Sequence, residues 1–437
     1  MAAELQETMN WLAEIADQHQ ELESPKSFWY WSAIAAMSAV IKDQVWLNRQ
    51  IYSLYPNIYV MLHAESGMKK GPPISMARQL VKPVNNTRII SGRSSIQGIL
   101  KDLGTGTTSP GGKINTKSVA FICSSELSSS IVEDKVATKI LTDLYDRQYN
   151  VGEWRSLLKM ETFELVDPTL TMLTATNEAM SEDFFTKAAI QGGYFARTFI
   201  IYEKSGTVNN SLIFPLTNPP NYVAAAEYLK EVAKLKGPFE SLAQVEKEGQ
   251  YKYCKKKFGR EIYFNEVGII YDDWYEEFKE RIRVTQHKDE TGTMNRFGDS
   301  VLKVAMLLAL AEKPELIMSA EAMTQAIEEC EKLLGNVRKT TLGKQGLSQS
   351  ALLKTMIIME LLNREPHSVS RAMLMKKMWA NYENATEFDD MMLSFHQAGM
   401  ITTSAMGNQI IYTMPVEQVK ELKEFMAGKE SKNKEKK

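Results

Sequence analysis

Four short, mainly apolar runs set the main constraint on how this chain can fold. They cover residues 58–62, 119–123, 170–173 and 199–202, and helix-compatible segments or loops lie between them. A strand that is apolar at every position is typical of a sheet covered by helices on both faces. The alternation of such strands with helices predicts a mostly parallel α/β core.

Composition excludes several classes of protein. The chain has 437 residues, of which 44% are hydrophobic and 24% charged, and its formal net charge is -2. It is therefore neither generally disordered nor a polycation. The three cysteines form no CxxC pair and the five histidines lack metal-ligand spacing, so we expect no metal site built from them, and a cytoplasmic location. The longest apolar stretch, 28–41, is too short to span a bilayer.

The segments around the apolar runs divide the chain into five predicted parts. These are a helical N-terminal segment (1–50), an α/β core (51–217), a helical lid (218–345), a winged-helix domain (346–415), and a C-terminal helix with a charged tail (416–437). Within the core, residues 151–169 are typical of an inserted β-hairpin. The charged segment 245–260 is expected to form a connection or short strands. The aromatic run 28–31 is expected to pack in a core or in an interface with a neighbouring subunit, with base stacking as the alternative.

The winged-helix prediction rests on the order of elements within 346–415. Three helices are followed by two short strands joined by a tight connection. The helix that would read DNA starts with the acids Glu387, Asp389 and Asp390. Sequence-specific reading favours Arg, Lys, Asn or Gln at such positions, so a role in protein contacts or in bracing a ring is preferred.

The loop after the first apolar run has the features of a phosphate-binding loop. Residues 64–71 read Ala-Glu-Ser-Gly-Met-Lys-Lys-Gly. Phosphate binding needs backbone N–H groups around the phosphates, a helix N-terminus behind them and a lysine that reaches the outer phosphates. Gly67 allows the close backbone approach, and Lys70 takes the lysine position. The predicted nucleotide-binding residues are Ser66, Gly67, Met68, Lys69, Lys70 and Gly71.

This loop departs from the pattern GxxxxGK[ST] at three positions. Ala64 and Lys69 replace the two glycines, and Gly71 replaces the hydroxyl residue that would contact Mg²⁺. A basic turn after a strand is the alternative interpretation. The missing hydroxyl affects the expected rate of hydrolysis more than it affects nucleotide binding.

Three polar residues stand at the ends of the later apolar runs. Glu126 follows the second run and would polarise an attacking water, and Asn177 follows the third and would hold the γ-phosphate or that water. Arg197 precedes the fourth run and would reach the γ-phosphate of a neighbouring subunit. The alternative for Glu126 is an ordinary acid at the end of a strand, and the alternative for Arg197 is a surface residue or a salt bridge. Their order favours an ATPase with ATP and Mg²⁺ as cofactors.

Residues from about 25 to 204 resemble a family of P-loop ATPase domains of unknown function, found in phage and mobile-element replication proteins and often beside primases. The resemblance rests on the loop Ser66 to Gly71, on Glu126 and on the segment Gly192 to Arg197. More distantly, the inserted hairpin and Arg197 are similar to the AAA+ module of minichromosome-maintenance helicases.

The resemblance implies an α/β P-loop NTPase core of the AAA+ or RecA-like type. It also implies a homo-oligomeric ring, for example a hexamer, that acts as an ATP-driven, helicase-like motor on single-stranded DNA in phage or mobile-element replication. A primase or another replication protein is the implied partner. In the distant relatives the hairpin grips DNA, which makes Arg155 and Lys159 the DNA-binding candidates here.

Alternatives to this assignment stay open. A non-hydrolysing nucleotide-binding scaffold, and a helicase or primase loader-adaptor that uses the winged helix, fit the same sequence. On the predicted lid, Arg296 and Lys303 are expected either to make a second contact with nucleotide or to belong to a solvated helix face.

Overall fold

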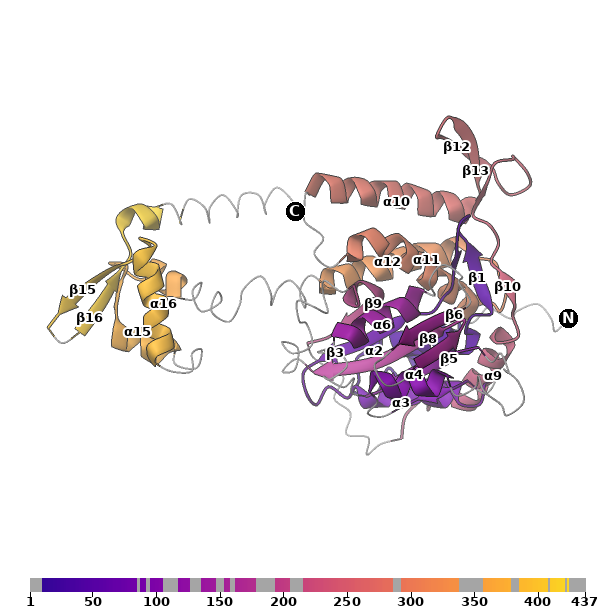
Figure 1. Ribbon diagram of the computed structural model, residues 1–437, viewed down its shortest axis with the longest axis horizontal. Helices are drawn as coiled ribbons and strands as arrows, with labels where there is room; N and C mark the ends of the chain where they lie inside the picture. Colours follow the sequence, from indigo (N-terminus) through magenta and orange to yellow (C-terminus); the bar gives the residue numbers. More distant parts are fainter. Residues whose placement is uncertain are drawn as a thin grey trace. The chain divides into compact units, whose positions relative to one another are not determined.

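In the computed structural model, the four apolar runs form four of the strands of a five-stranded, all-parallel sheet (Figure 1). Its strand order is β4-β5-β8-β3-β9. These strands cover Ile89–Ile90, Val119–Ser124, Thr169–Asn177, Tyr59–Ala64 and Thr198–Tyr202. Every residue of β3, and all but the last of β8, is buried, as strands covered on both faces must be. The predicted α/β class is confirmed.

The structure describes residues 10–84, 87–91, 95–104, 117–125, 135–146, 153–157, 162–177, 193–204, 215–285, 292–337, 357–378, 385–407, 409–420 and 423. The chain divides into two units, Met1–Thr341 and Leu342–Lys437.

One face of the central sheet is covered by α2 (Lys26–Ile41) and α3 (Gly71–Val81). Of the 16 residues of α2, 13 are buried, so this helix lies inside the core rather than on its surface. The aromatic run within it packs as expected, since Phe28, Trp29 and Trp31 are all buried. The shorter α1 (Trp11–Gln18) packs against α2.

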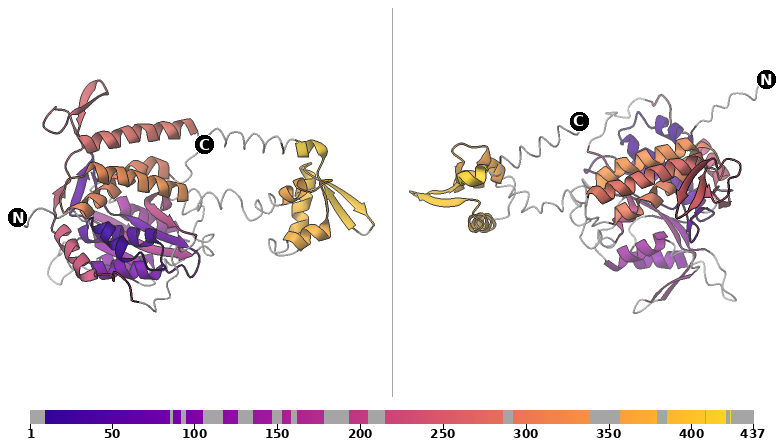
Figure 2. Two further views of the ribbon diagram at one scale, coloured as in Figure 1. Left: turned by 180° about the vertical axis from the view of Figure 1, so that it is seen from behind. Right: turned by 90° about the horizontal axis from the view of Figure 1, so that it is seen from above.

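The other face is covered by α4 (Ile96–Gly104) and α6 (Lys135–Asp146). Alternate residues of the strands point to this side, and Tyr59, Met61 and Met172 join the side chains of these helices in a second core cluster. Helices thus lie on both sides of the sheet (Figure 2), which gives the three layers expected of a parallel α/β unit.

The segment predicted as a separate helical lid belongs to the same unit. It contains α9 (Tyr222–Val232), α10 (Glu266–Thr285), α11 (Thr293–Glu312) and α12 (Ala320–Val337). Residues 301–311 of α11 are all buried, and α11 and α2 share one hydrophobic cluster. The three segments predicted before residue 345 therefore share a core. No described helix, α11 included, has the length and apolar character needed to cross a membrane.

Within the described part of this unit, three small sheets lie outside the central one. β1 (Val45–Asn48) pairs with β2 (Ser53–Leu54) and β10 (Gly237–Pro238). β6 (Glu153–Leu157) and β7 (Thr162–Val166) form the hairpin predicted over 151–169. β11 (Ala243–Gln244), β12 (Tyr253–Lys257) and β13 (Arg260–Phe264) form an antiparallel sheet in the region of the charged segment.

The second unit combines helices with a three-stranded antiparallel sheet. A helical stretch at 357–362 precedes the remaining elements, which are β14 (Ser368–Ser370), α15 (Arg371–Met378), α16 (Ala385–Gln397), β15 (Thr402–Met406) and β16 (Gln409–Thr413). β16 pairs with both other strands. The unit has a hydrophobic core of its own, with Phe388 fully buried within it.

Because its core is self-contained, a fragment spanning residues 342–437 is expected to fold alone. In that fragment Phe388→Ala should lower the free energy of unfolding by about 3–5 kcal/mol, the usual loss for a buried phenylalanine. Leu393 lies on the same helix but is 53% exposed, so Leu393→Ala should change it by less than about 0.5 kcal/mol. Urea denaturation followed by circular dichroism measures both. Equal effects of the two substitutions would contradict the assigned core.

Candidate functional site

The predicted phosphate-binding loop leaves the sheet at the carboxyl end of β3. Gly67 has a φ of +89° and Lys69 a φ of +46°, and the N–H of Lys69 donates to the carbonyl of Gly67 at 2.8 Å. These two left-handed residues turn the backbone back toward the start of α3. A Cβ built on Gly67 would meet no atom within 4 Å, so the space beside the loop is open.

Lys69 occupies the position of a motif glycine, and its backbone has the conformation that glycine would supply. For a residue with a side chain, this left-handed conformation costs about 1 kcal/mol. The Lys69 ammonium lies 3.7 Å from the carboxylate of Glu23, and the Lys69 carbonyl accepts a hydrogen bond from Ser24 Oγ at 2.7 Å. Contacts with the segment before α2 therefore hold the loop in this shape.

The ammonium of Lys70 lies over the loop that precedes it. Its Nζ donates to the carbonyl oxygens of Ala64 at 2.9 Å and Glu65 at 2.7 Å. Partial burial lowers the pKa of Lys70. An anion bound beside the loop would favour the charged form of this amine, because opposite charges within a few ångströms do so.

The helix behind the loop begins in an unusual way. α3 starts with Gly71, and Pro72 and Pro73 follow. Proline is tolerated in a first helical turn because the N–H groups there have no intrahelical partner, but it brings no N–H of its own. The backbone donors for an anion must therefore come from the loop before Pro72. Gly71 also offers no hydroxyl to Mg²⁺, so these residues fit phosphate better than they fit the metal.

Asn177 lies directly beside this loop. It is the last residue of β8, and the register pairs it with Ala64 at the end of β3, which places the two strands about 4.8 Å apart there. β5 ends on the other side of β8, where Ser125 is exposed. Glu126 lies outside the described residues. The loop and Asn177 thus meet at the carboxyl edge of the sheet, where open α/β sheets bind their ligands.

Arg197 lies at the opposite side of the sheet, where the amino ends of the strands are. It ends the 3₁₀ helix η2 (Phe195–Arg197) just before β9, whose first residue pairs with Tyr59 at the start of β3. The length of β3 separates this level from the loop by roughly 17 Å, at about 3.3 Å per residue. Arg197 therefore does not reach the loop of its own chain.

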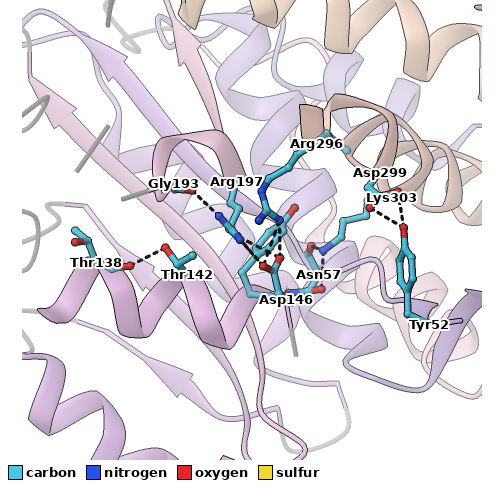
Figure 3. Close-up of polar contacts among 12 residues, drawn as sticks. Tyr52, Asn57, Thr138, Thr142, Asp146, Gly193, Arg197, Arg296, Asp299 and Lys303 are labelled. Atoms are coloured by element: carbon cyan, nitrogen blue, oxygen red, sulfur yellow. Dashed lines mark hydrogen bonds and ion pairs between the residues drawn. The ribbon is translucent and has the colours of Figure 1, made fainter. Parts of the chain in front are cut away.

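The guanidinium of Arg197 is engaged within its own chain. The side chain is 6% exposed, and its Nε and Nη2 contact the carboxylate of Asp146 at the end of α6. Nη1 donates to the Gly193 carbonyl at 2.9 Å, and a Cβ on Gly193 would lie only 2.8 Å from that nitrogen. Arg296 on α11 lies 3.3 Å from the same carboxylate, so two cations converge on one acid (Figure 3).

Lys303 is buried next to this ion pair (Figure 3). Its Nζ donates to the main-chain and side-chain oxygens of Asn57 at 3.0 and 2.9 Å, and it lies 3.7 Å from the centre of the Tyr145 ring. Burial lowers the pKa of Lys303 to about 7, although Asp146 and Asp299 act in the opposite direction. Lys303 and Arg296 thus lie far from the loop of their own chain, and Lys303 is not part of a solvated helix face.

These groups line a cavity of about 140 Å³ at the amino edge of the sheet. The sequence singled out Arg197, Arg296 and Lys303, but it missed Asp146 and Asn57, which bind them. Asn57 immediately precedes the first apolar run and could have been noticed there. Nothing in the sequence marks Asp146 as the shared partner of two arginines that lie 51 and 150 residues away.

The predicted DNA-binding residues lie on or beside the β6–β7 hairpin. Lys159 falls outside the described residues, and only the backbone position of Arg155 is described. The register places Arg155 opposite an acidic residue, Glu164. The 14 residues 153–166 carry two cations and three acids, a formal charge of -1. This hairpin therefore lacks the excess of positive charge that DNA binding favours.

One acidic group on α10 could be mistaken for a metal site. Asp272, Asp273 and Glu276 offer carboxylate oxygens within 4.8 Å of one another. The ammonium of Lys255 lies 2.6–2.8 Å from all three carboxylates. A lysine thus already takes the place a cation would need.

Comparisons with known proteins identify no relative. No protein-family model matches the chain, and no curated protein matches it significantly. The family resemblance of the loop therefore stays a prediction.

The buried lysine should make stability depend on pH. The pKa of Lys303 is about 7 in the folded chain and about 10.4 in an unfolded one. Between these values the unfolded state binds a proton that the folded state does not, so the free energy of unfolding rises with pH, by at most about 1.4 kcal/mol per unit. The rise in the free energy of unfolding that comes from Lys303 is complete above about pH 10.4 and is lost as the pH falls to about 7.

Urea denaturation of the whole chain at several pH values from 7 to 10 would measure this rise. Lys303→Met should reduce the slope, because the group that titrates is gone. The control is Lys313→Met, at the exposed C-terminal end of the same helix, which should leave the slope as it is. An unchanged slope in Lys303→Met would show that this lysine does not carry the pH dependence.

Proposed function

We propose that the first unit is a P-loop nucleotide-binding domain of the AAA+ type that binds ATP at the loop 64–71. The observation that carries this proposal is the geometry at the carboxyl end of β3. There, two left-handed residues curl the backbone, Lys70 lies over the loop, and a helix begins behind it. Backbone N–H groups, a helix N-terminus and one lysine are the parts from which proteins build phosphate sites.

We propose a role for each residue at this edge of the sheet. The loop N–H groups would bind the phosphates, and Lys70 would exchange its two carbonyl contacts for phosphate oxygens. Asn177, beside the loop, would hold the outer phosphate or a water molecule. Glu126 is the proposed base that activates this water. Mg²⁺, when bound with ATP, would neutralise phosphate charge.

The position of Arg197 supports an oligomer. Because it lies a full strand length from the loop of its own chain, it can act on a phosphate only across a subunit interface. We infer a ring in which one subunit supplies the loop and the next supplies Arg197, after that arginine leaves Asp146. Coupled to hydrolysis, such a ring would drive movement on single-stranded DNA in phage or mobile-element replication, with a primase or another replication protein as partner.

We propose that the second unit is a winged helix, from its order of elements and its three-stranded sheet. At the start of α16, Asp389 receives two hydrogen bonds of 2.7 Å from Arg371. A recognition helix that opens with a paired acid is poorly suited to a DNA groove. A protein-binding role is therefore favoured for this unit.

A second function is favoured by the missing hydroxyl. Gly71 stands where P-loop proteins hold Mg²⁺ with Ser or Thr, which would slow hydrolysis more than binding. In that case the chain is a nucleotide-binding scaffold, or a loader-adaptor for a helicase or primase. Tight ATP binding by the wild type without turnover, in the presence or absence of single-stranded DNA, would support this candidate.

Two neighbouring lysines allow a sharp test of the loop. Lys70→Ala should weaken ATP binding about tenfold or more, because it removes charge-assisted contacts to phosphate. Lys69→Gly should keep the affinity within about threefold, because glycine adopts the left-handed conformation of Lys69 without strain. Isothermal titration calorimetry with ATP and Mg²⁺ measures both.

Thermal denaturation without nucleotide is the control for folding in both variants. If Lys70→Ala is folded and binds ATP as tightly as the wild type, the loop is a basic turn and the proposal fails. An equal loss of ATP affinity in Lys69→Gly would indicate general damage to the loop rather than a specific role of Lys70.

Subunit mixing tests the role of Arg197. Lys70→Ala and Arg197→Ala should each lose ATP hydrolysis alone. In mixed oligomers, about a quarter of the interfaces would combine an intact loop with an intact arginine if subunits mix at random. A partial return of hydrolysis on mixing is therefore expected.

Asp146→Asn separates this role from a purely structural one. It breaks the ion pair within the chain but keeps the guanidinium. If Arg197 serves only that ion pair, Asp146→Asn should lose as much hydrolysis as Arg197→Ala, and mixing should restore none.

A further inference from the structure

The β12–β13 hairpin carries a concentration of positive charge on an otherwise balanced chain. Residues 251–264 contain five cations and one acid, a formal charge of +4. The β6–β7 hairpin has the same number of residues and a formal charge of -1. In two views the β12–β13 hairpin extends away from the helices of the first unit (Figures 1 and 2).

Two of the five cations fasten the hairpin to α10. Lys255 and Lys257 form ion pairs with Asp272 and Glu276 on that helix. The other three, Lys252, Lys256 and Arg260, are exposed, and no acidic partner lies within ion-pair distance among the described residues. The one acid, Glu261, is paired with Lys256 in the strand register, but its carboxylate accepts a hydrogen bond of 2.6 Å from the Tyr263 hydroxyl and forms no ion pair with Lys256.

The tip of the hairpin holds an aromatic side chain where protein stability gives no reason for one. Phe258 is 99% exposed. Phe258 and Gly259 have φ values of +52° and +79° and join the pair Lys257–Arg260. Two-residue turns with positive φ at both positions favour Asn-Gly or Asp-Gly. A phenylalanine is sterically disfavoured at the first position, and here it buries nothing in return.

We propose that this hairpin binds single-stranded nucleic acid, with the Phe258 ring stacked on a base and with Lys252, Lys256 and Arg260 contacting phosphates. An exposed aromatic ring flanked by unpaired cations is the combination that such proteins use, since every base offers a face for stacking. The charge of the three cations is complementary to the backbone. This inference names the DNA contact of the proposed motor but does not depend on ATP binding.

The test uses the whole chain and a fluorescein-labelled 30-residue oligo-dT, with anisotropy as the readout. Phe258→Ala should weaken binding at least fivefold, the lower end of what one stacked base contributes. The double variant Lys256→Ala/Arg260→Ala should lower the slope of log affinity against log salt by about 1.4, since each phosphate contact contributes about 0.7.

Phe258→Asn distinguishes a functional aromatic from a structural one. Because Asn is well suited to a left-handed turn position, this variant should be at least as thermally stable as the wild type. It should nevertheless lose affinity as Phe258→Ala does. Two exposed residues elsewhere in the unit serve as controls, Val223 on α9 and Lys101 on α4. Val223→Ala and Lys101→Ala should leave both affinity and salt slope unchanged.

Unchanged oligo-dT affinity in Phe258→Ala and Phe258→Asn would overturn the inference, as would equal losses in the two controls. ATP binding by the same variants separates this result from the proposed function. If the wild type binds no ATP, and Phe258→Asn lowers the affinity for oligo-dT, the hairpin inference stands and the ATPase proposal fails. If ATP binds and the hairpin variants keep their DNA affinity, only the hairpin inference fails.

Discussion

Burial of β3 on both faces is the constraint on which the rest of the first unit depends. All six of its residues are enclosed, with α2 and α3 on one side and α4 and α6 on the other. The chain becomes exposed to solvent only where this strand leaves the sheet, at Glu65 and Ser66. The length of the apolar run therefore determines where the loop is placed. α2 adds to this because its buried aromatic residues fix the segment, Glu23 and Ser24, that holds Lys69.

The same strand separates two polar sites. Its carboxyl end leads into the loop, beside Asn177 of β8, and its amino end lies beside the cluster of Asp146, Arg197 and Lys303. Charges in that cluster are balanced by hydrogen bonds and by the Tyr145 ring, as buried ions require. A side chain at one end cannot serve chemistry at the other within one chain. The proposed oligomer would bring both into one reaction.

The two hairpins of the first unit show why position in the sequence is a weak guide to nucleic-acid binding. The β6–β7 hairpin was singled out by its place before the Asn177 strand, yet it is acidic on balance. The β12–β13 hairpin lies in a segment expected only to connect other elements. Strand pairing places Lys257 and Arg260 on either side of the turn that holds Phe258, and ion pairs to α10 engage Lys255 and Lys257. Only the three-dimensional arrangement shows which cations remain available.

Local sequence patterns are enough to predict the α/β class, four of the five strands of the main sheet, the β6–β7 hairpin and the position of the loop. Each of these follows from local periodicity or from residues that are neighbours in the chain. Only the folded chain shows that the N-terminal segment and the helices after residue 218 share one core with the sheet. In it, α2 and α11 bury their apolar sides against each other and against the strands. The folded chain also brings Asp146 into ion pairs with both Arg197 and Arg296. Ion pairs between residues far apart in the sequence depend on how layers stack, which no local pattern records.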